Sequence, residues 1–267
     1  MKPLAESASL ECERIAPVPA SARAMLLGAR PERIILHVSA NDKEMAKLVD
    51  TLPFFAPNSN SRREIIEFPA WDTMPFDRNS PNQRIVSQRV KALSVLANGL
   101  DKNKQYIIVT TLNAALQKLP PIAAMRDNFL DIKKGAAIKT ETLLKFFADN
   151  SYDRVSKVYE SGEFAVRGSI LDVFPAGSEK PVRIDFFGDV VETIKVFDPI
   201  TQISEAVLEE IKLFSAAEII LNLTNIESFK KNFRVKFGNF KEDDGFFNAI
   251  SSGVKHQGYE KSGSKFS

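Results

Sequence analysis

Between residues 33 and 118 the chain alternates short apolar runs with stretches of helical periodicity, and this alternation restricts the possible fold more than any other feature. The apolar runs cover residues 33–39, 64–68 and 106–110. Residues 41–52 and the segment after residue 80 carry apolar side chains at helical spacing. Strands separated by helices usually pair in parallel, with helices on the sheet faces. We therefore expect an α/β domain over residues 1–128.

The helix expected after residue 79 has the clearest start signal. Ser80 suits the N-cap, Pro81 suits the first helical position, and Gln83 follows the cap by three residues. Asn98 and Gly99 mark the expected end of this helix. A short helix is expected at 113–118.

The pattern changes after residue 128. We expect a helix at 140–149, followed by antiparallel strands at 164–174, 182–187 and 190–197, with Gly188-Asp189 as a hairpin turn. These segments predict a small inserted α+β domain over residues 129–213. From residue 204 onward the chain is expected to be more helical. Residues 214–267 are expected to form a mostly helical part that packs on the first domain and has a frayed tail.

The strand–helix rhythm of the first domain calls for a search for a phosphate-binding loop. Such a loop needs glycines whose backbone N–H groups surround the phosphates, a Lys, and a Ser or Thr for magnesium. Gly253 and Gly258 have the required separation, but Tyr259 and Glu260 follow them. The dinucleotide-binding pattern of three glycines does not occur either. We therefore expect no ATP binding, no cofactor and no catalytic residue in this chain.

Other reactive residues give weak signals. His37 lies inside an apolar strand and is expected to be a hydrogen-bonded core residue, with a catalytic role as the alternative. His256 lies in the polar tail, and the acidic pairs Asp243-Asp244 and Glu209-Glu210 are expected to be solvated. Two His and one Cys (Cys12) rarely suffice for zinc, so no metal site is expected.

Composition limits the possible partners and cellular location of the protein. The formal net charge of +2 is too small to indicate a nucleic-acid-binding domain by itself. No apolar run approaches the roughly 18 residues of a membrane helix, and the N-terminus lacks the apolar core of a secretory signal. A single cysteine allows no intrachain disulfide. We expect a cytoplasmic protein with no membrane partner.

One basic and aromatic stretch has two interpretations. Phe229, Phe233, Phe237 and Phe240 recur at helical spacing, with Lys230, Lys231, Arg234 and Lys236 among them. An amphipathic helix docked by its phenylalanines is the favoured interpretation. Contact with nucleic acid through the basic residues is the alternative.

The strand at 182–187 is the most informative segment. Alternation places Val182, Ile184 and Phe186 on one face, and Arg183, Asp185 and Phe187 on the other. Because Phe186 can fill the core, Phe187 is expected to be exposed.

The preceding strand adds a second arginine to this face. Phe164, Val166 and Ile170 are expected to point inward, and Arg167 outward. Arg167, Arg183 and Phe187 then form one outward patch, of the composition that protein interfaces favour. The alternative is a surface pair of Arg183 with Asp185, and a Phe187 covered by another domain.

Two long motifs resemble a known family. Residues 162–175, 183–189 and 197–198 are similar to the second domain shared by UvrB and the bacterial transcription-repair coupling factors. Residues 68–77 with Ser80-Pro81 resemble the first domain of the coupling factors. UvrB has a phosphate loop where this sequence reads residues 20–27, and its loss favours the coupling factors. The fold that this resemblance implies is a degenerate helicase-like parallel sheet domain with the inserted α+β domain.

The resemblance also implies a function. Coupling factors displace stalled RNA polymerase with an ATP-driven, magnesium-dependent translocase and recruit UvrA for nucleotide excision repair. Their second domain binds UvrA, and the contact residues correspond to Arg167, Arg183 and Phe187. We therefore expect a non-enzymatic UvrA-recruiting module, whose RNA polymerase and DNA contacts belong to family regions missing here. The alternative is a UvrB-like module that binds or verifies damaged DNA.

Overall fold

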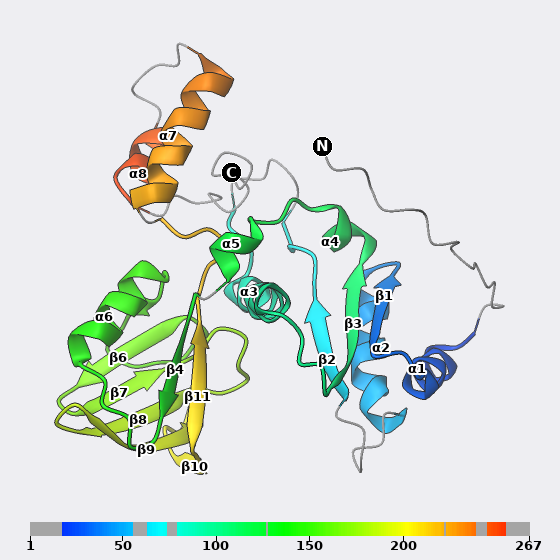
Figure 1. The fold of residues 1–267 in the computed structure, drawn as a ribbon, viewed down its shortest axis with the longest axis horizontal. Coiled ribbons are helices and arrows are strands. Elements are labelled where there is room, and N and C mark those ends of the chain that lie inside the picture. The colour runs from blue at the N-terminus through cyan, green and yellow to red at the C-terminus, as the bar shows by residue number, and fades with distance from the viewer. Residues whose placement is uncertain are drawn as a thin grey trace.

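The computed structural model describes residues 18–55, 63–73, 79–126, 128–221, 223–238 and 245–254. Within these residues the fold is mixed α/β, with three separate sheets (Figure 1). None of the helices described there combines the length and hydropathy needed to cross a membrane.

The first sheet is parallel, as the alternation predicts. Its strands are β1 (Ile34–Ser39), β3 (Gln105–Thr111) and β2 (Arg63–Phe68), in that spatial order. Its helices are α1 (Ala20–Ala29), α2 (Asp42–Phe55), α3 (Gln83–Asn98), α4 (Leu112–Leu116) and α5 (Ile122–Met125). The cores show that α1 and α2 cover one face of this sheet and α3 covers the other. The more specific helicase-like arrangement stays a prediction.

Helix α3 begins later than expected. Its N-cap is Asn82, whose side-chain oxygen accepts a hydrogen bond from the backbone N–H of Arg84 at 2.9 Å. The carboxylate of Asp72 in turn accepts from the backbone N–H of Asn82 at 3.0 Å. The predicted Ser80 cap is therefore wrong, because Asn caps as well as Ser and Asp72 holds the chain at Asn82. The predicted end is confirmed, since Gly99 follows the helix with φ of +91°.

The second sheet is almost wholly antiparallel. Its order is β10 (Ser204–Leu208), β9 (Val190–Phe197), β8 (Val182–Phe187), β7 (Ile170–Val173), β6 (Glu163–Arg167) and β5 (Asp153–Arg154), with only β5 parallel to its neighbour. Helix α6 (Thr140–Asp149) packs on one face. The ring of Phe147 from α6 stacks on that of Phe164 from β6, with centroids 4.4 Å apart. We call the face away from α6 the outer face.

The single strand expected at 164–174 is in fact two. A two-residue turn, Gly168-Ser169, joins β6 to β7, and Gly168 adopts φ of +61°, a conformation that glycine permits. This turn places Arg167 directly opposite Ile170. Ile170 therefore lies on the outer face, and the prediction that it points inward is wrong.

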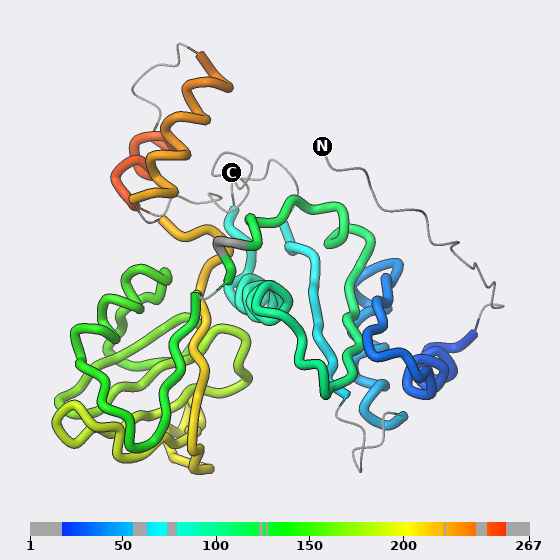
Figure 2. The backbone as a smooth tube through the Cα atoms, in the orientation of Figure 1, coloured from blue at the N-terminus to red at the C-terminus, as the bar shows by residue number. Residues whose placement is uncertain are grey.

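A third sheet, of two strands, lies where the chain enters and leaves the region of the second sheet. Strands β4 (Phe129–Lys133) and β11 (Glu210–Phe214) pair antiparallel, with Phe129 opposite Phe214. Figure 2 shows the chain entering the region of the second sheet through β4 and leaving it through β11. Strands β10 and β11 occupy residues that were expected to be more helical. The domain limits at 128 and 213 stay a prediction.

The C-terminal helices α7 (Leu223–Phe237) and α8 (Gly245–Ser251) pack on each other. Phe229 and Phe233 are buried against Phe247 and Ile250, as the amphipathic interpretation predicts, whereas Phe237 is half-exposed. Phe240 lies outside the described residues. The expected packing of this part on the first domain stays a prediction.

A buried ion pair joins the first sheet's helices to the chain that leaves β11. Arg89 of α3 is 0% exposed and Glu218 is 2% exposed. The Nε of Arg89 donates to Oε1 of Glu218 at 2.5 Å, and its Nη1 donates to the carbonyl of Pro69 at 2.7 Å. Trp71 donates to the same carboxylate at 2.8 Å. The pair is thus fully hydrogen-bonded, which is the condition under which buried charges are tolerated.

Helix α3 also contacts the inserted region through side chains spaced four residues apart. Gln83 donates to the carbonyl of Ala216 at 2.9 Å, and Lys91 donates to the carbonyl of Gly177 at 2.9 Å. Between them, the hydroxyl of Ser87 accepts from that of Ser161 at 3.0 Å. One face of α3 thereby fixes the second sheet relative to the first (Figure 1).

Candidate partner-binding surface

The outer face of the second sheet brings together the three residues predicted from the sequence. Arg183 lies opposite Asp172 on β7, and Ile170 lies opposite both Arg167 and Asp185. Because side chains alternate along a strand, Arg183, Asp185 and Phe187 share the outer face. Arg167, Arg183 and Phe187 therefore lie on one face of one sheet, as expected.

A buried carboxylate holds the two arginines. Arg183 donates to Asp172 through Nε at 2.7 Å and through Nη2 at 2.9 Å, and Arg167 donates through Nη2 at 2.8 Å. The side chain of Asp172 is 1% exposed, that of Arg183 21%, and that of Arg167 51%. The hydrogen bond that Arg183 donates to the Asp172 carboxylate raises the pKa of Arg183. The guanidinium carbon of Arg183 also lies 4.8 Å from the ring centroid of Phe197.

The predicted alternative pairing is not the one observed. Asp185 accepts a hydrogen bond from the hydroxyl of Thr193 at 2.7 Å and from Lys195 at 3.5 Å. Asp172 takes the place expected for Asp185 as the partner of Arg183. The sequence contained a signal for this, since Asp172 alternates with the inward-facing Leu171 and Val173.

Phe187 is the most exposed part of this surface. Its side chain is 80% exposed, and the opposite residue, Val190, is 41% exposed. The register shift in this hairpin falls between Asp185 and Phe186, with the extra residue on β9, so β8 keeps its alternation and Phe186 packs on the core. Four residues of strand separate Phe187 from Arg183, about 13 Å. We call Arg167, Arg183, Phe187 and Val190 the outer patch.

The opposite end of the outer face is covered. Val158 and Phe197 are both 0% exposed and form a small core with Ala165 and Phe174. Solvent therefore reaches the outer face mainly at its Phe187 end.

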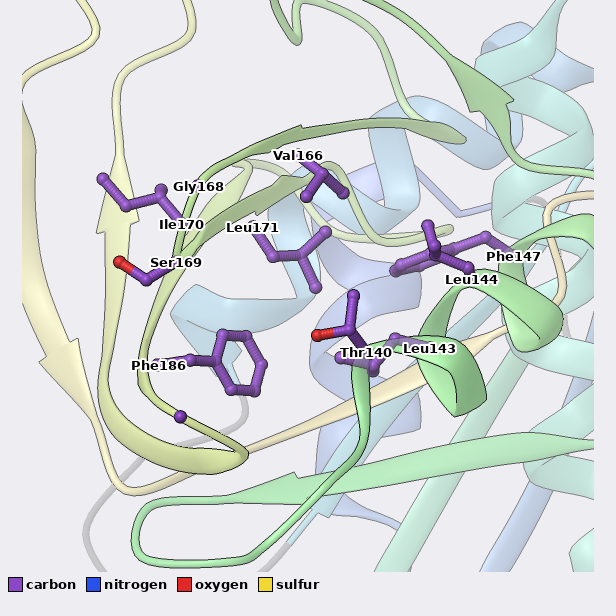
Figure 3. A pocket seen from close by; sticks show the side chains of 11 residues that line it. Thr140, Leu143, Leu144, Phe147, Val166, Gly168, Ser169, Ile170, Leu171 and Phe186 are labelled. Atoms are coloured by element: carbon purple, nitrogen blue, oxygen red, sulfur yellow. The ribbon is translucent and has the colours of Figure 1, made fainter.

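A small apolar cavity lies on the other side of the sheet, beneath the two hairpin turns that border the outer patch. Figure 3 shows Leu143, Leu144 and Phe147 of α6 facing Val166 and Leu171 of the sheet, with Phe186 beside them. The volume is about 80 Å³. Ligand pockets usually measure about 300–1,000 Å³, so this cavity is too small for a nucleotide.

The other residues singled out in the sequence lie away from this surface. His37 is half-buried, and its Nε2 has no hydrogen-bond partner among the described residues, so the expectation of a hydrogen-bonded core histidine is wrong for this atom. Glu209 and Glu210 are exposed, and Glu210 pairs with Lys133 at 2.9 Å. Cys12, His256 and Asp243-Asp244 lie outside the described residues.

The basic residues of α7 are mainly at its surface. Lys230 pairs with Glu227 at 2.9 Å, and Lys231, Arg234 and Lys236 follow on the same helix. Contact of these residues with nucleic acid stays a prediction. Among the described residues no group of three or more His, Cys, Asp or Glu is placed to hold a metal ion.

Comparison with known proteins places this surface in a family context. Residues 130–219, which contain the whole outer patch, match the UvrB interaction domain family. The transcription-repair-coupling factor of Rickettsia bellii is 38% identical over 224 residues, which are 84% of this chain and 19% of that protein. Most of the chain is thus similar to one part of the transcription-repair-coupling factors.

Coupling factors from outside Rickettsia are similar over a smaller share of this chain. The transcription-repair-coupling factor of Haemophilus influenzae is 36% identical over 75% of this chain and 17% of its own length. That of Escherichia coli is 32% identical over 71% of this chain and 16% of its own length. The chain thus spans about a fifth of the length of the coupling factors that it matches.

Proposed function

We propose that this chain is the UvrA-recruiting module of a transcription-coupled nucleotide excision repair factor. The observation that supports this most directly is the outer patch, in which two arginines and an exposed phenylalanine lie within the segment that matches the UvrB interaction domain. In the complete factor, displacement of stalled RNA polymerase and ATP-driven, magnesium-dependent translocation on DNA would belong to other regions. The first sheet would be a degenerate, helicase-like relic without a nucleotide site.

The chemistry of the patch suits a protein partner. Planar guanidinium groups form charge-assisted hydrogen bonds with carboxylates, and Arg167 retains N–H groups that bond to nothing else among the described residues. Phe187 would enter an apolar pocket of UvrA. Aromatic and arginine side chains supply most of the binding energy at many interfaces.

The central test is a titration of UvrA with the wild-type chain and with Phe187→Ala. Loss of a central aromatic side chain typically costs about 2 kcal/mol or more, so the dissociation constant should rise at least about 30-fold. Because Phe187 is 80% exposed, chemical denaturation should show unchanged stability. Arg183→Ala should also abolish binding, but it removes two hydrogen bonds from the buried Asp172, so its stability must be measured too.

A matched control is available in the same sheet. Ile200 is also 80% exposed, but it lies in the turn after β9, at the end of the sheet away from Phe187. Ile200→Ala should bind UvrA like the wild type. Equal affinity of Phe187→Ala, Arg167→Ala and the wild type for UvrA would refute the proposal.

Competition gives a second test. If the patch occupies the site that UvrB uses on UvrA, adding the chain should displace UvrB in a pull-down, and Phe187→Ala should not.

The alternative of a UvrB-like damaged-DNA-binding or verifying module predicts ATP turnover and salt-dependent DNA binding. Lys231→Glu with Lys236→Glu should leave DNA affinity unchanged if α7 makes no such contact.

A further inference from the structure

Asp172 occupies an unusual position in the outer patch. Its side chain is 1% exposed, so a protein partner cannot reach it. It nevertheless accepts all three hydrogen bonds that the side chains of the two arginines make among the described residues. Its β-strand neighbours Leu171 and Val173 are buried on the opposite face. The carboxylate therefore acts on a partner only through Arg167 and Arg183.

The two arginines differ in how firmly they are held. Arg183 uses two N–H groups on Asp172, contacts the ring of Phe197 and is 21% exposed. Arg167 uses one N–H group and is 51% exposed. Two guanidinium groups sharing one acceptor repel each other, and each side chain has about 2 kcal/mol of rotamer entropy to lose when it is ordered. The shared carboxylate offsets both effects before a partner arrives.

We propose that Asp172 is a positioning residue of the outer patch, that Arg183 is fixed by it as a support, and that Arg167 is the cation that reaches an acidic group of the partner. This inference rests on the proposed UvrA-binding function. At the exposed end of the outer face, Arg167 keeps side-chain N–H groups that no described residue accepts. The partner surface therefore presents a carboxylate to Arg167 beside the apolar pocket for Phe187.

The first experiment compares two variants of neighbouring residues in a titration against UvrA. Asp172→Asn keeps the shape of the side chain but removes the charge that orders the guanidinium groups. Val173→Ala is the control, because Val173 is 0% exposed on the α6 face and its loss lowers stability without touching either arginine. Asp172→Asn should weaken binding about tenfold, a coupling of the size that networked charges show. Val173→Ala should bind like the wild type.

A double-mutant cycle separates positioning from a structural role. In the Arg167→Ala background Asp172→Asn should cause little further loss of affinity, because its effect passes through Arg167. Additive losses, an unchanged affinity of Asp172→Asn, or an equal loss with Val173→Ala would each overturn the inference. If Phe187→Ala still weakens binding in such a case, the proposed function stands and only the role of Asp172 fails. If no patch variant changes the affinity, the proposed function and the role of Asp172 both fail.

A measurement on the unmodified chain covers the possibility that Asp172→Asn does not fold. In the unbound wild type, the Nε–H proton of Arg183 should exchange slowly with water by NMR, because Asp172 accepts it. The corresponding proton of Arg167 should exchange rapidly. Rapid exchange of the Arg183 proton would contradict a preformed support.

Discussion

His37 shows how a single polar atom affects the stability of the first sheet. It lies on β1, on the same face as Ile35, which packs against the α1 and α2 core. Burial, and secondarily the positive charge of Arg23, lowers the pKa of His37 below its ordinary value. Its Nε2 is buried and has no hydrogen-bond partner among the described residues. A buried donor or acceptor without a partner reduces stability.

His37→Leu should therefore stabilise the chain by about 1 kcal/mol at neutral pH. In the wild type, the unfolded state binds more protons than the folded state between the lowered pKa and about 6.5, so stability should fall as the pH decreases through this window. The His37→Leu variant should lose this part of the pH dependence. The difference in stability between the variant and the wild type should therefore grow towards pH 5. Urea denaturation of both chains at pH 7.5 and pH 5 measures the difference. Parallel pH profiles would contradict the assignment.

At the scale of elements, α3 is the part that sets the position of the UvrB interaction domain. Gln83, Ser87 and Lys91 are spaced four residues apart, so they lie on one side of the helix, facing residues of the inserted region. Glycines allow the close approach. A Cβ on Gly177 would lie 2.5 Å from Cβ of Lys91, and one on Gly162 would lie 2.8 Å from Nε2 of Gln83.

Gly177→Ala should destabilise the chain by about 2 kcal/mol or more. A left-handed conformation costs a non-glycine residue about 1–2 kcal/mol, and Gly177 has φ of +72°. The contact with Lys91 adds to that cost. Gly188→Ala is the control, because its φ is +60° but no atom lies within 4 Å of the added Cβ. Equal loss of stability in guanidinium denaturation would show that the contact with α3 contributes nothing.

The sequence predicts elements well where the pattern is local and poorly where it depends on pairing. The parallel sheet, α6 and the β8–β9 hairpin follow from periodicity and turn residues, and the structure confirms them. The Gly168-Ser169 turn was missed because apolar residues continue on both sides of it. Strands β4 and β11 were missed because each is short and is stabilised by a partner about 80 residues away. Asp172 was missed for the same reason, since its contact with Arg183 exists only once the strands pair.

For the molecule as a whole, the Arg89–Glu218 pair joins its two halves. Arg89 belongs to α3, whereas Glu218 follows β11 and precedes α7. Three further side chains contact the pair, because Trp71 and Gln117 join the hydrogen-bond network and the Phe68 ring lies 4.3 Å from the guanidinium carbon. Removal of one partner leaves the other as an unpaired buried charge.

Glu218→Gln should therefore destabilise the chain by about 3 kcal/mol or more. Arg89→Met should have a similar effect, since it leaves the Glu218 carboxylate at 2% exposure without its guanidinium. The double variant Arg89→Met with Glu218→Met should be more stable than the sum of the single losses predicts, because no charge remains buried. Thermal or chemical denaturation of the three variants tests this order. Additive losses would indicate that the two residues act independently.

The β4–β11 ribbon has a consequence for engineering and for evolution. Because Phe129 and Phe214 are direct partners, with ring centroids 6.4 Å apart, the excursion between them begins and ends at nearly one point. Such a segment can be exchanged between host proteins through a single pair of splice positions, without stretching either host. The outer patch lies within this segment, so the same splice would let it be grafted onto an unrelated scaffold.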